Sequence, residues 1–286
     1  YATVAEFRDV RRKNLRNAVE QLQDSAIGDP LTVAGMQNTL GVSLLGLGEA
    51  ELAIRMYEQA RATNVAKLGP DHPDTLTSMN NLAFGYSSAG KLDLALPLFE
   101  ETLRLRKAKL GPDHPDTLTS MGNLGKAYCD AKQGEKAAPI LAAFVAGQPK
   151  RFPKDHPAFA GLLARVSLEL LKCDQFNTAE EMLREALAIR EKTEPKAWTT
   201  FNTQSMLGEA LLGQKKYTDA EPLLLKDYEG MQAREKTIPS QAATSIPEAL
   251  DRLIALYTAL EKPEEVQKYR DLRAKYPADK TEGTKP

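Results

Sequence analysis

The fourteen residues AKLGPDHPDTLTSM occur twice in this chain, at residues 66–79 and again at residues 108–121. The two copies begin 42 residues apart. A catalytic loop is needed once in a chain, whereas a structural unit that stacks on copies of itself is needed several times. The duplication therefore indicates a repeat protein, and the period is the first constraint on its fold.

The duplicated turn sets a register that continues through most of the chain. An apolar anchor recurs in six copies, and in the three copies that contain a histidine it lies ten residues after that histidine. The six anchors are Leu40, Leu82, Leu124, Val166, Leu207 and Leu253. In most copies a small residue follows the anchor, an alanine stands thirteen residues after the anchor, and a large apolar residue comes four residues later.

This spacing indicates pairs of helices, with a helix A that carries the anchor and a helix B that carries the alanine. Small side chains let A and B approach closely, while the large residues fill the space between them at i, i+4 spacing. One pair cannot bury its apolar face alone, so successive pairs must stack. The pattern resembles the L-G-x₂-Y…A-x₃-F signature of tetratricopeptide repeats. That resemblance implies an all-α, right-handed superhelical solenoid of about six 42-residue helix-turn-helix units.

The register predicts where each element lies. The expected helix A ranges are 31–46, 73–88, 115–130, 157–172, 199–213 and 245–259. The expected helix B ranges are 50–67, 92–109, 134–148, 176–193, 217–235 and 264–275. A solenoid is expected over residues 29–275, with units at about 31–68, 69–110, 111–152, 153–194, 195–236 and 243–275.

The two ends of the chain are expected to differ from the repeats, because a solenoid needs polar caps. Residues 1–28 are interpreted as an N-terminal amphipathic capping helix. The side chains expected to pack on the first unit are Phe7, Val10, Leu15, Val19 and Leu22. Residues 276–286 contain few apolar side chains and are interpreted as a disordered tail.

The repeated turn has the chemistry of a helix stop followed by a helix start. Gly-Pro ends helix B, because glycine suits a left-handed C-terminal residue and proline cannot continue the helix. Asp71 and Asp113 are expected to cap the next helix through its free N–H groups. Pro73 and Pro115 fall in the first turn, where a missing N–H costs nothing. The histidines are therefore interpreted as turn residues, and no metal site is expected.

Within the repeat family, the connector resembles the kinesin-light-chain type. The residues that carry this resemblance are Gly69–Thr75 with Asn80–Ala83, Gly111–Thr117 with Asn123–Gly125, and the helix B ending at 186–192. The segments at 201–235 and 253–270 also resemble repeat regions appended to bacterial serine/threonine protein kinases. The kinase motifs themselves, H-R-D, D-F-G and V-A-I-K, do not occur in this sequence.

The resemblance implies a concave groove lined by the A helices. With the anchor counted as position 7, the groove-facing positions of the family are 2, 5, 6, 9, 12 and 13. The candidate groove residues are Asn38, Asn80, Asn81, Phe84, Asn123, Lys126, Arg165, Leu168 and Lys172. Asn81 and Asn123 occupy the same position in successive repeats. An asparagine amide carries a donor and an acceptor, so it can pair with the backbone of an extended peptide.

The other candidates would supply charge and apolar contact. Positive potential for acidic side chains or a terminal carboxylate would come from Lys126, Arg165, Lys172 and Arg252, and apolar pockets would come from Phe84, Leu168 and Leu171. The alternative is that these side chains are only a solvated helix face, with asparagine as polar filler.

Composition limits the remaining possibilities. The formal net charge is −1 with acids and bases interspersed, which gives no indication of nucleic acid as a partner. No apolar run approaches the roughly 18 residues of a membrane span, and no signal peptide is visible, so a cytoplasmic location is expected. No catalytic motif, phosphate loop or cofactor signature is present, so neither an enzyme nor a cofactor is expected.

These observations predict a protein-protein interaction scaffold that binds a peptide or partner protein in the groove. It would serve as the interaction region of a larger bacterial signalling protein. The alternative left open by the sequence is a self-association module that brings parent serine/threonine kinase chains together.

Overall fold

The computed structural model describes residues 4–23, 28–148 and 153–276. Over these residues the regular structure is helical and contains no β-strand. The chain divides into two compact units, residues 1–147 and residues 148–286, and each is described by itself. The expectation of an all-α protein made of paired helices is confirmed for the described part of the chain.

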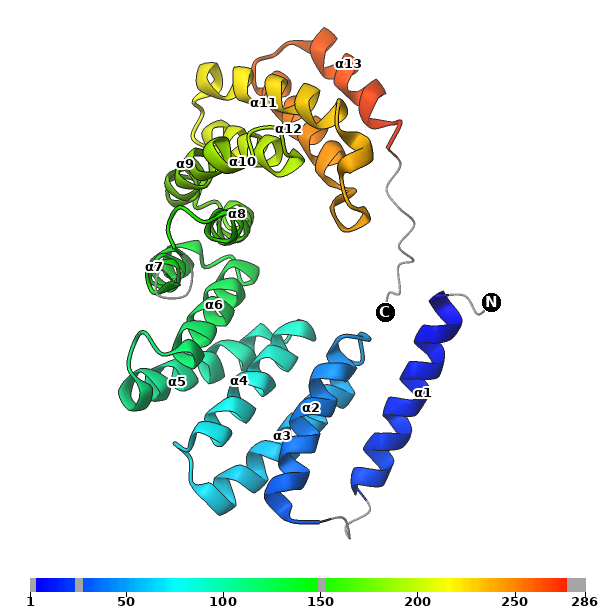
Figure 1. Ribbon diagram of the computed structural model, residues 1–286, viewed down its shortest axis with the longest axis vertical. Coiled ribbons are helices and arrows are strands. Elements are labelled where there is room, and N and C mark those ends of the chain that lie inside the picture. The colour runs from blue at the N-terminus through cyan, green and yellow to red at the C-terminus, as the bar shows by residue number, and fades with distance from the viewer. Residues whose placement is uncertain (1–3, 24–27, 149–152, 277–286) are drawn as a thin grey trace. The chain divides into compact units, whose positions relative to one another are not determined.

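The first unit contains a leading helix followed by three antiparallel pairs (Figure 1). Its helices are α1 (Val4–Gln23), α2 (Pro30–Leu45), α3 (Ala50–Leu68), α4 (Pro73–Ser88), α5 (Leu92–Leu110), α6 (Pro115–Asp130) and α7 (Gly134–Ala146). Each even-numbered helix is an A helix, and it packs on the B helix that follows it. On its other side, α2 contacts the leading helix α1, whereas α4 and α6 pack on the B helix before them. Neighbouring A helices also contact each other, α2 with α4 and α4 with α6.

The second unit repeats this arrangement. Its α-helices are α8 (Pro157–Lys172), α9 (Phe176–Thr193), α10 (Trp198–Gly213), α11 (Tyr217–Gln232), α12 (Ser245–Ala259) and α13 (Pro263–Arg273). Two short 3₁₀ turns, η2 (Glu235–Thr237) and η3 (Ser240–Ala242), connect α11 to α12. In both units the A and B helices begin and end within three residues of the ranges expected from the sequence.

The core consists of the predicted small-to-large contacts between A and B of one pair. Gly41 of α2 lies directly against the ring of Tyr57 on α3, which is fully buried. Gly125 lies in the same way against Leu141, and Gly208 against Leu224. A side chain on any of these glycines would meet its partner at less than normal contact distance. The small residue after the anchor therefore sets how closely the two helices of a pair approach.

The turn between pairs is capped differently from the expectation. The N-cap residues of α4, α6 and α8 are His72, His114 and His156, and not the preceding aspartates. Each imidazole Nδ1 accepts a hydrogen bond from the backbone N–H two residues later, at 3.2, 3.2 and 3.1 Å. Asp71 instead forms an ion pair with Lys109 on α5, at 2.9 Å. The prediction of Asp71 and Asp113 as N-caps was wrong, because the extended residue before the helix is the histidine.

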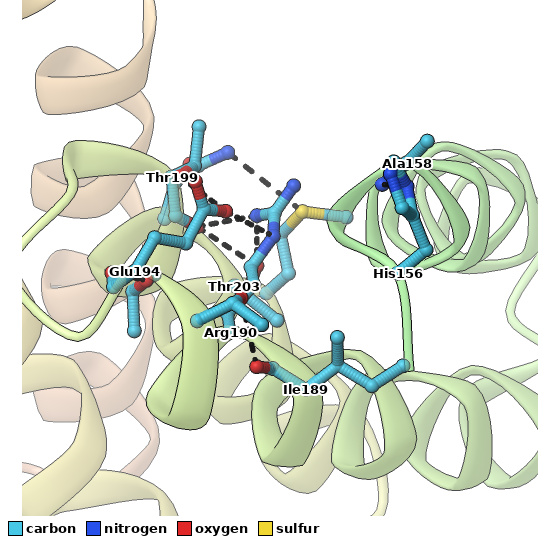
Figure 2. A network of polar contacts seen from close by, with 11 residues as sticks. His156, Ala158, Ile189, Arg190, Glu194, Thr199 and Thr203 are labelled. Carbon is cyan, nitrogen blue, oxygen red and sulfur yellow. Dashed lines mark hydrogen bonds and ion pairs between the residues drawn. The ribbon is translucent and has the colours of Figure 1, made fainter. Parts of the chain in front are cut away.

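A buried polar residue near the end of helix B holds the next helix A. Asn64, Arg106 and Arg190 occupy the same register, and all three are buried. Arg190 on α9 donates to the backbone carbonyl of Thr199 and to the hydroxyl of Thr203, both on α10, and its Nε lies 3.4 Å from a carboxylate oxygen of Glu194 (Figure 2). These contacts fix the start of each A helix against the preceding B helix.

The first and last helices of the chain, α1 and α13, cover the neighbouring helix pairs, α1 with aliphatic side chains and α13 with an aromatic one. Val19 of α1 is buried in the cluster formed by α2 and α3, and Leu15 and Leu22 pack against it. Val10 is 59% exposed, so the expectation that it packs on the first unit was wrong, and the side chain of Phe7 lies outside the described residues. On α13, Tyr269 stacks on Tyr257 with ring centroids 5.5 Å apart. The predicted tail, residues 276–286, lies outside the described part except for its first residue, Tyr276.

Candidate functional site

The A helices of the first unit are joined by hydrogen bonds between asparagines. Asn81 Nδ2 on α4 donates to Asn38 Oδ1 on α2 at 3.3 Å, and Asn123 Nδ2 on α6 donates to Asn80 Oδ1 on α4 at 3.4 Å. Position 6 of each A helix thus bonds to position 5 of the A helix before it. Four of the predicted site residues are brought together in this way, as two equivalent pairs.

Each position 5 asparagine is held in turn by a serine of the next A helix. Asn38 Nδ2 donates to Ser78 Oγ at 2.8 Å, whereas Asn80 Oδ1 accepts from Ser120 Oγ at 3.3 Å. The serines are anchored from helix B, because Ser78 Oγ also accepts from the buried Asn64 and Ser120 Oγ accepts from the buried Arg106, each at 2.9 Å.

The asparagines differ in exposure. Asn80 is only 6% exposed, so it lies beneath the surface, and its Oδ1 accepts hydrogen bonds from Ser120 and Asn123. Asn38, Asn81 and Asn123 are half-buried. In the described part of the chain, Oδ1 of Asn81 and Oδ1 of Asn123 accept no hydrogen bond. Each residue of the outer pair, Asn81 and Asn123, therefore has an amide carbonyl that the described part of the chain does not occupy.

An apolar row lies beside the asparagines, at position 9 of the same helices. Val42 on α2 is 58% exposed and Phe84 on α4 is 41% exposed. Lys126 follows in the same row on α6, where its ammonium pairs with Asp130 at 2.6 Å. We call Val42, Asn81, Phe84, Asn123 and Lys126 the first-unit A-face. It combines amide groups, exposed apolar surface and a cation that is already partly neutralised.

The remaining predicted site residues belong to α8, in the second unit. Arg165 is exposed, Leu168 is half-buried, and Lys172 is exposed with its ammonium 3.2 Å from Glu169. These three residues occupy positions 6, 9 and 13 of their helix. They form a set of their own, separate from the first-unit A-face.

Sequence reasoning treated Arg252 as a source of positive potential, and the structure corrects this. Arg252 is buried on α12, where Nε lies 2.5 Å from Glu209 and Nη2 lies 3.7 Å from Glu248. Its Nη1 donates to Ser205 at 3.2 Å, which repeats the position 6 to position 5 contact of the first unit. Because two carboxylates neutralise Arg252, it offers little charge to a ligand.

Asp227 on α11 is a buried acid that interacts with Ser205 and Arg252, and no sequence pattern predicted it. Burial raises the pKa of the Asp227 carboxyl well above its usual value, although the Ser205 hydroxyl and the Arg252 charge act in the opposite direction. The folded chain therefore binds this proton more tightly than the unfolded chain does. The stabilisation is complete below the unfolded pKa, about 3.9, and is lost as pH rises through the folded pKa.

We expect Asp227→Asn to stabilise the second unit, and increasingly so as pH rises. Near pH 4 both side chains are neutral, so the free energies of unfolding should differ least; toward neutral pH only the aspartate is penalised by ionisation. Urea unfolding at a series of pH values measures the difference. Asp219→Asn on the exposed side of the same helix is the matched control and should show no such trend. A difference that is constant with pH would contradict the assignment.

A pocket that sequence reasoning did not predict lies between α1 and the α2–α3 turn. Its volume is about 600 Å³, and its lining includes Arg16, Glu20, Glu49 and Arg55. Arg16 is held by Glu49 at 3.0 Å, so this lining is already largely paired. Among the described helices, none combines the length and apolar character needed to cross a membrane.

Two protein-family models match the chain, and both are described as tetratricopeptide repeat. One matches residues 32–108 and 86–143, and the other matches residues 160–194. Together the matched residues make up just over half of the chain. No curated protein sequence gives a significant match.

Solved structures with similar folds include a kinesin-light-chain-like protein of Podosopora anserina with nearly identical TPR-like repeats. It is 25% identical, with a TM-score of 0.64 over 73% of this chain and 99% of that one. BtubC (BKLC) from P. vanneervenii is 17% identical, with a TM-score of 0.62 over 82% of this chain and 93% of its own. The apo form of RapI is 14% identical, with a TM-score of 0.60 over 94% of this chain and 93% of its own.

Proposed function

Because this chain belongs to the tetratricopeptide repeat family, we propose that it is a protein-protein interaction scaffold whose first-unit A-face holds an extended segment of a partner protein. Stacked helix pairs of this kind build rigid surfaces wider than one helix, which suit an extended ligand. Repeat scaffolds of this family are generally not catalytic, and neither family model describes a catalytic family.

One observation carries the proposal: Asn81 and Asn123 stand at the same position of neighbouring A helices, each with one N–H bound to the preceding helix and its carbonyl unpaired in the described part. A row of identical amides, one per repeat, matches the regular N–H and C=O groups of an extended backbone. Exposed Phe84 and Val42 next to them offer contacts for apolar side chains.

The α8 residues extend the proposal to the second unit. Arg165 and Lys172 carry positive charge on the exposed side of α8, with half-buried Leu168 between them. This combination favours a ligand segment with acidic and apolar residues. Glu169 offsets part of the charge, so we expect a modest preference for acidic segments.

The test is selection of binders from a displayed library of random twelve-residue peptides, followed by fluorescence-polarisation titration of the tightest one. The double variant Asn81→Ala/Asn123→Ala should bind this peptide at least about fivefold more weakly, since each lost amide hydrogen bond contributes about 0.5–1.5 kcal/mol. Phe84→Ala should also weaken binding.

The matched control is the double variant Asn14→Ala/Asn17→Ala, which makes the same chemical change at two exposed asparagines of α1. It should bind the peptide like the original chain. Equal affinity for the Asn81/Asn123 variant and the control would contradict the assignment of the first-unit A-face. Failure of the library to yield any binder would contradict the proposed function itself.

The wider context of the scaffold rests on the resemblance of segments 201–235 and 253–270 to repeat regions beside bacterial kinases. It supports a place for this chain within a larger bacterial signalling protein. A kinase catalytic domain in the same reading frame would be the direct test of that context.

A further inference from the structure

The hydrogen bonds beneath the first-unit A-face run in a definite direction. An arginine guanidinium can only donate, a backbone carbonyl can only accept, and a serine hydroxyl has a single proton to give. The observed contacts obey these rules and give the end of each asparagine amide that faces its neighbour. The orientation of the outer asparagines then follows step by step.

In the α4–α6 pair, the direction begins at Arg106. Arg106 Nη1 donates to Ser120 Oγ at 2.9 Å and to the carbonyl of Asp116 at 2.9 Å. Ser120 gives its proton to Asn80 Oδ1. The carbonyl end of Asn80 therefore faces α6, and Asn123 can only meet it with its NH₂ end.

In the α2–α4 pair, the direction begins at a backbone carbonyl. Ser78 gives its proton to the carbonyl of Asp74 at 3.1 Å and so accepts from Asn38 Nδ2. With its Nδ2 bound to Ser78, Asn38 presents its carbonyl oxygen to Asn81, and Asn81 donates to it through Nδ2. The serine accepts from Asn38 in one pair of helices and donates to Asn80 in the other, yet Asn81 and Asn123 have the same orientation.

We propose that Asn38 and Asn80 are positioning residues that lock Asn81 and Asn123 with their amide carbonyls available to a ligand, so that N–H donors of the bound segment can pair with them at both places. This inference rests on the proposed function for its biological meaning, but the locking itself is a property of the free protein. Pre-set side chains bind more tightly, because ordering a free one costs about 0.5–1.5 kcal/mol.

The locking is tested without any ligand, by ¹⁵N relaxation of side-chain amides in deuterated protein labelled at asparagine. In the original chain both Asn81 and Asn123 should be as rigid as the backbone. Asn80→Ala, which introduces the residue found at the equivalent Ala164, should mobilise the Asn123 amide and leave Asn81 rigid. Asn38→Ala should do the reverse. Each variant is thus the control for the other.

Two outcomes would overturn the inference. One is an Asn123 amide that is as mobile in the original chain as in Asn80→Ala. The other is loosening of both amides in either variant, which would mean that the substituted residue only holds the repeats together. With the selected peptide as probe, Asn80→Ala should bind about three- to tenfold more weakly. If no peptide is selected, the proposed function fails, while the relaxation result still decides this inference.

Discussion

Arg190→Met should lower the free energy of unfolding of the second unit by about 3 kcal/mol. Arg190 is only 7% exposed, and its guanidinium contacts Thr199, Thr203 and Glu194 at once (Figure 2). Methionine fills most of the volume but leaves the Thr199 carbonyl without its charged donor. Hydrogen bonds to a charged group contribute about 1.5–3 kcal/mol each, and the Thr199 carbonyl would keep only the Thr203 hydroxyl, at 2.9 Å, as a side-chain donor.

Amide hydrogen exchange in α9 and α10 measures this effect locally, which matters because a repeat protein need not unfold in one step. The matched control is Arg184→Met on the same helix. Arg184 is exposed and pairs with Glu180 at 2.8 Å, so its loss should cost less than about 1 kcal/mol. Similar protection of α10 amides in both variants would show that the buried contacts of Arg190 contribute no more to stability than the exposed ion pair of Arg184.

Gly41→Ala and Gly35→Ala make the same chemical change on one helix, α2, and should have opposite effects on stability. A Cβ on Gly41 would overlap the ring of Tyr57, which is buried and cannot retreat, so we expect a cost of about 2 kcal/mol. A Cβ on Gly35 would meet nothing within 4 Å. There the higher helix propensity of alanine should stabilise the chain by about 0.5–1 kcal/mol.

Urea unfolding followed by circular dichroism at 222 nm, a standard helix signal, reports both glycine variants. A second test asks whether the Tyr57 ring causes the destabilisation. Gly41→Ala combined with Tyr57→Leu should recover part of the lost free energy of unfolding, because leucine can move its terminal methyl groups aside. If both glycine variants stabilise the chain alike, propensity dominates and the close approach of α2 to α3 does not limit the fold.

Helix positions could be predicted from this sequence because their signals are local or strictly periodic. The anchor residues recur with the repeat, and glycine and proline mark the turns by their own backbone restrictions. The cap was missed by one residue. Asp71 and His72 are both polar and adjacent, and only the extended backbone of His72, with φ −67° and ψ 143°, decides which of them precedes the helix.

The candidate site was less predictable, because its properties depend on contacts between repeats. Asn80 and Asn81 are neighbours in sequence, yet one is buried under the surface and the other reaches it. That difference follows from how α4 is rotated against α2 and α6, which no residue pattern records. The same holds for Arg252, whose charge is cancelled by Glu209 on another A helix, 43 residues earlier.

The arginines at the ends of the B helices also set how far the length of the connecting turn can vary. Arg106 reaches the carbonyl ten residues ahead and the hydroxyl fourteen ahead, whereas Arg190 reaches equivalent groups nine and thirteen ahead. One residue has been deleted between α9 and α10, and the long side chain still spans the gap. An arginine at this place therefore keeps its contacts with the next A helix when the connecting turn is one residue shorter.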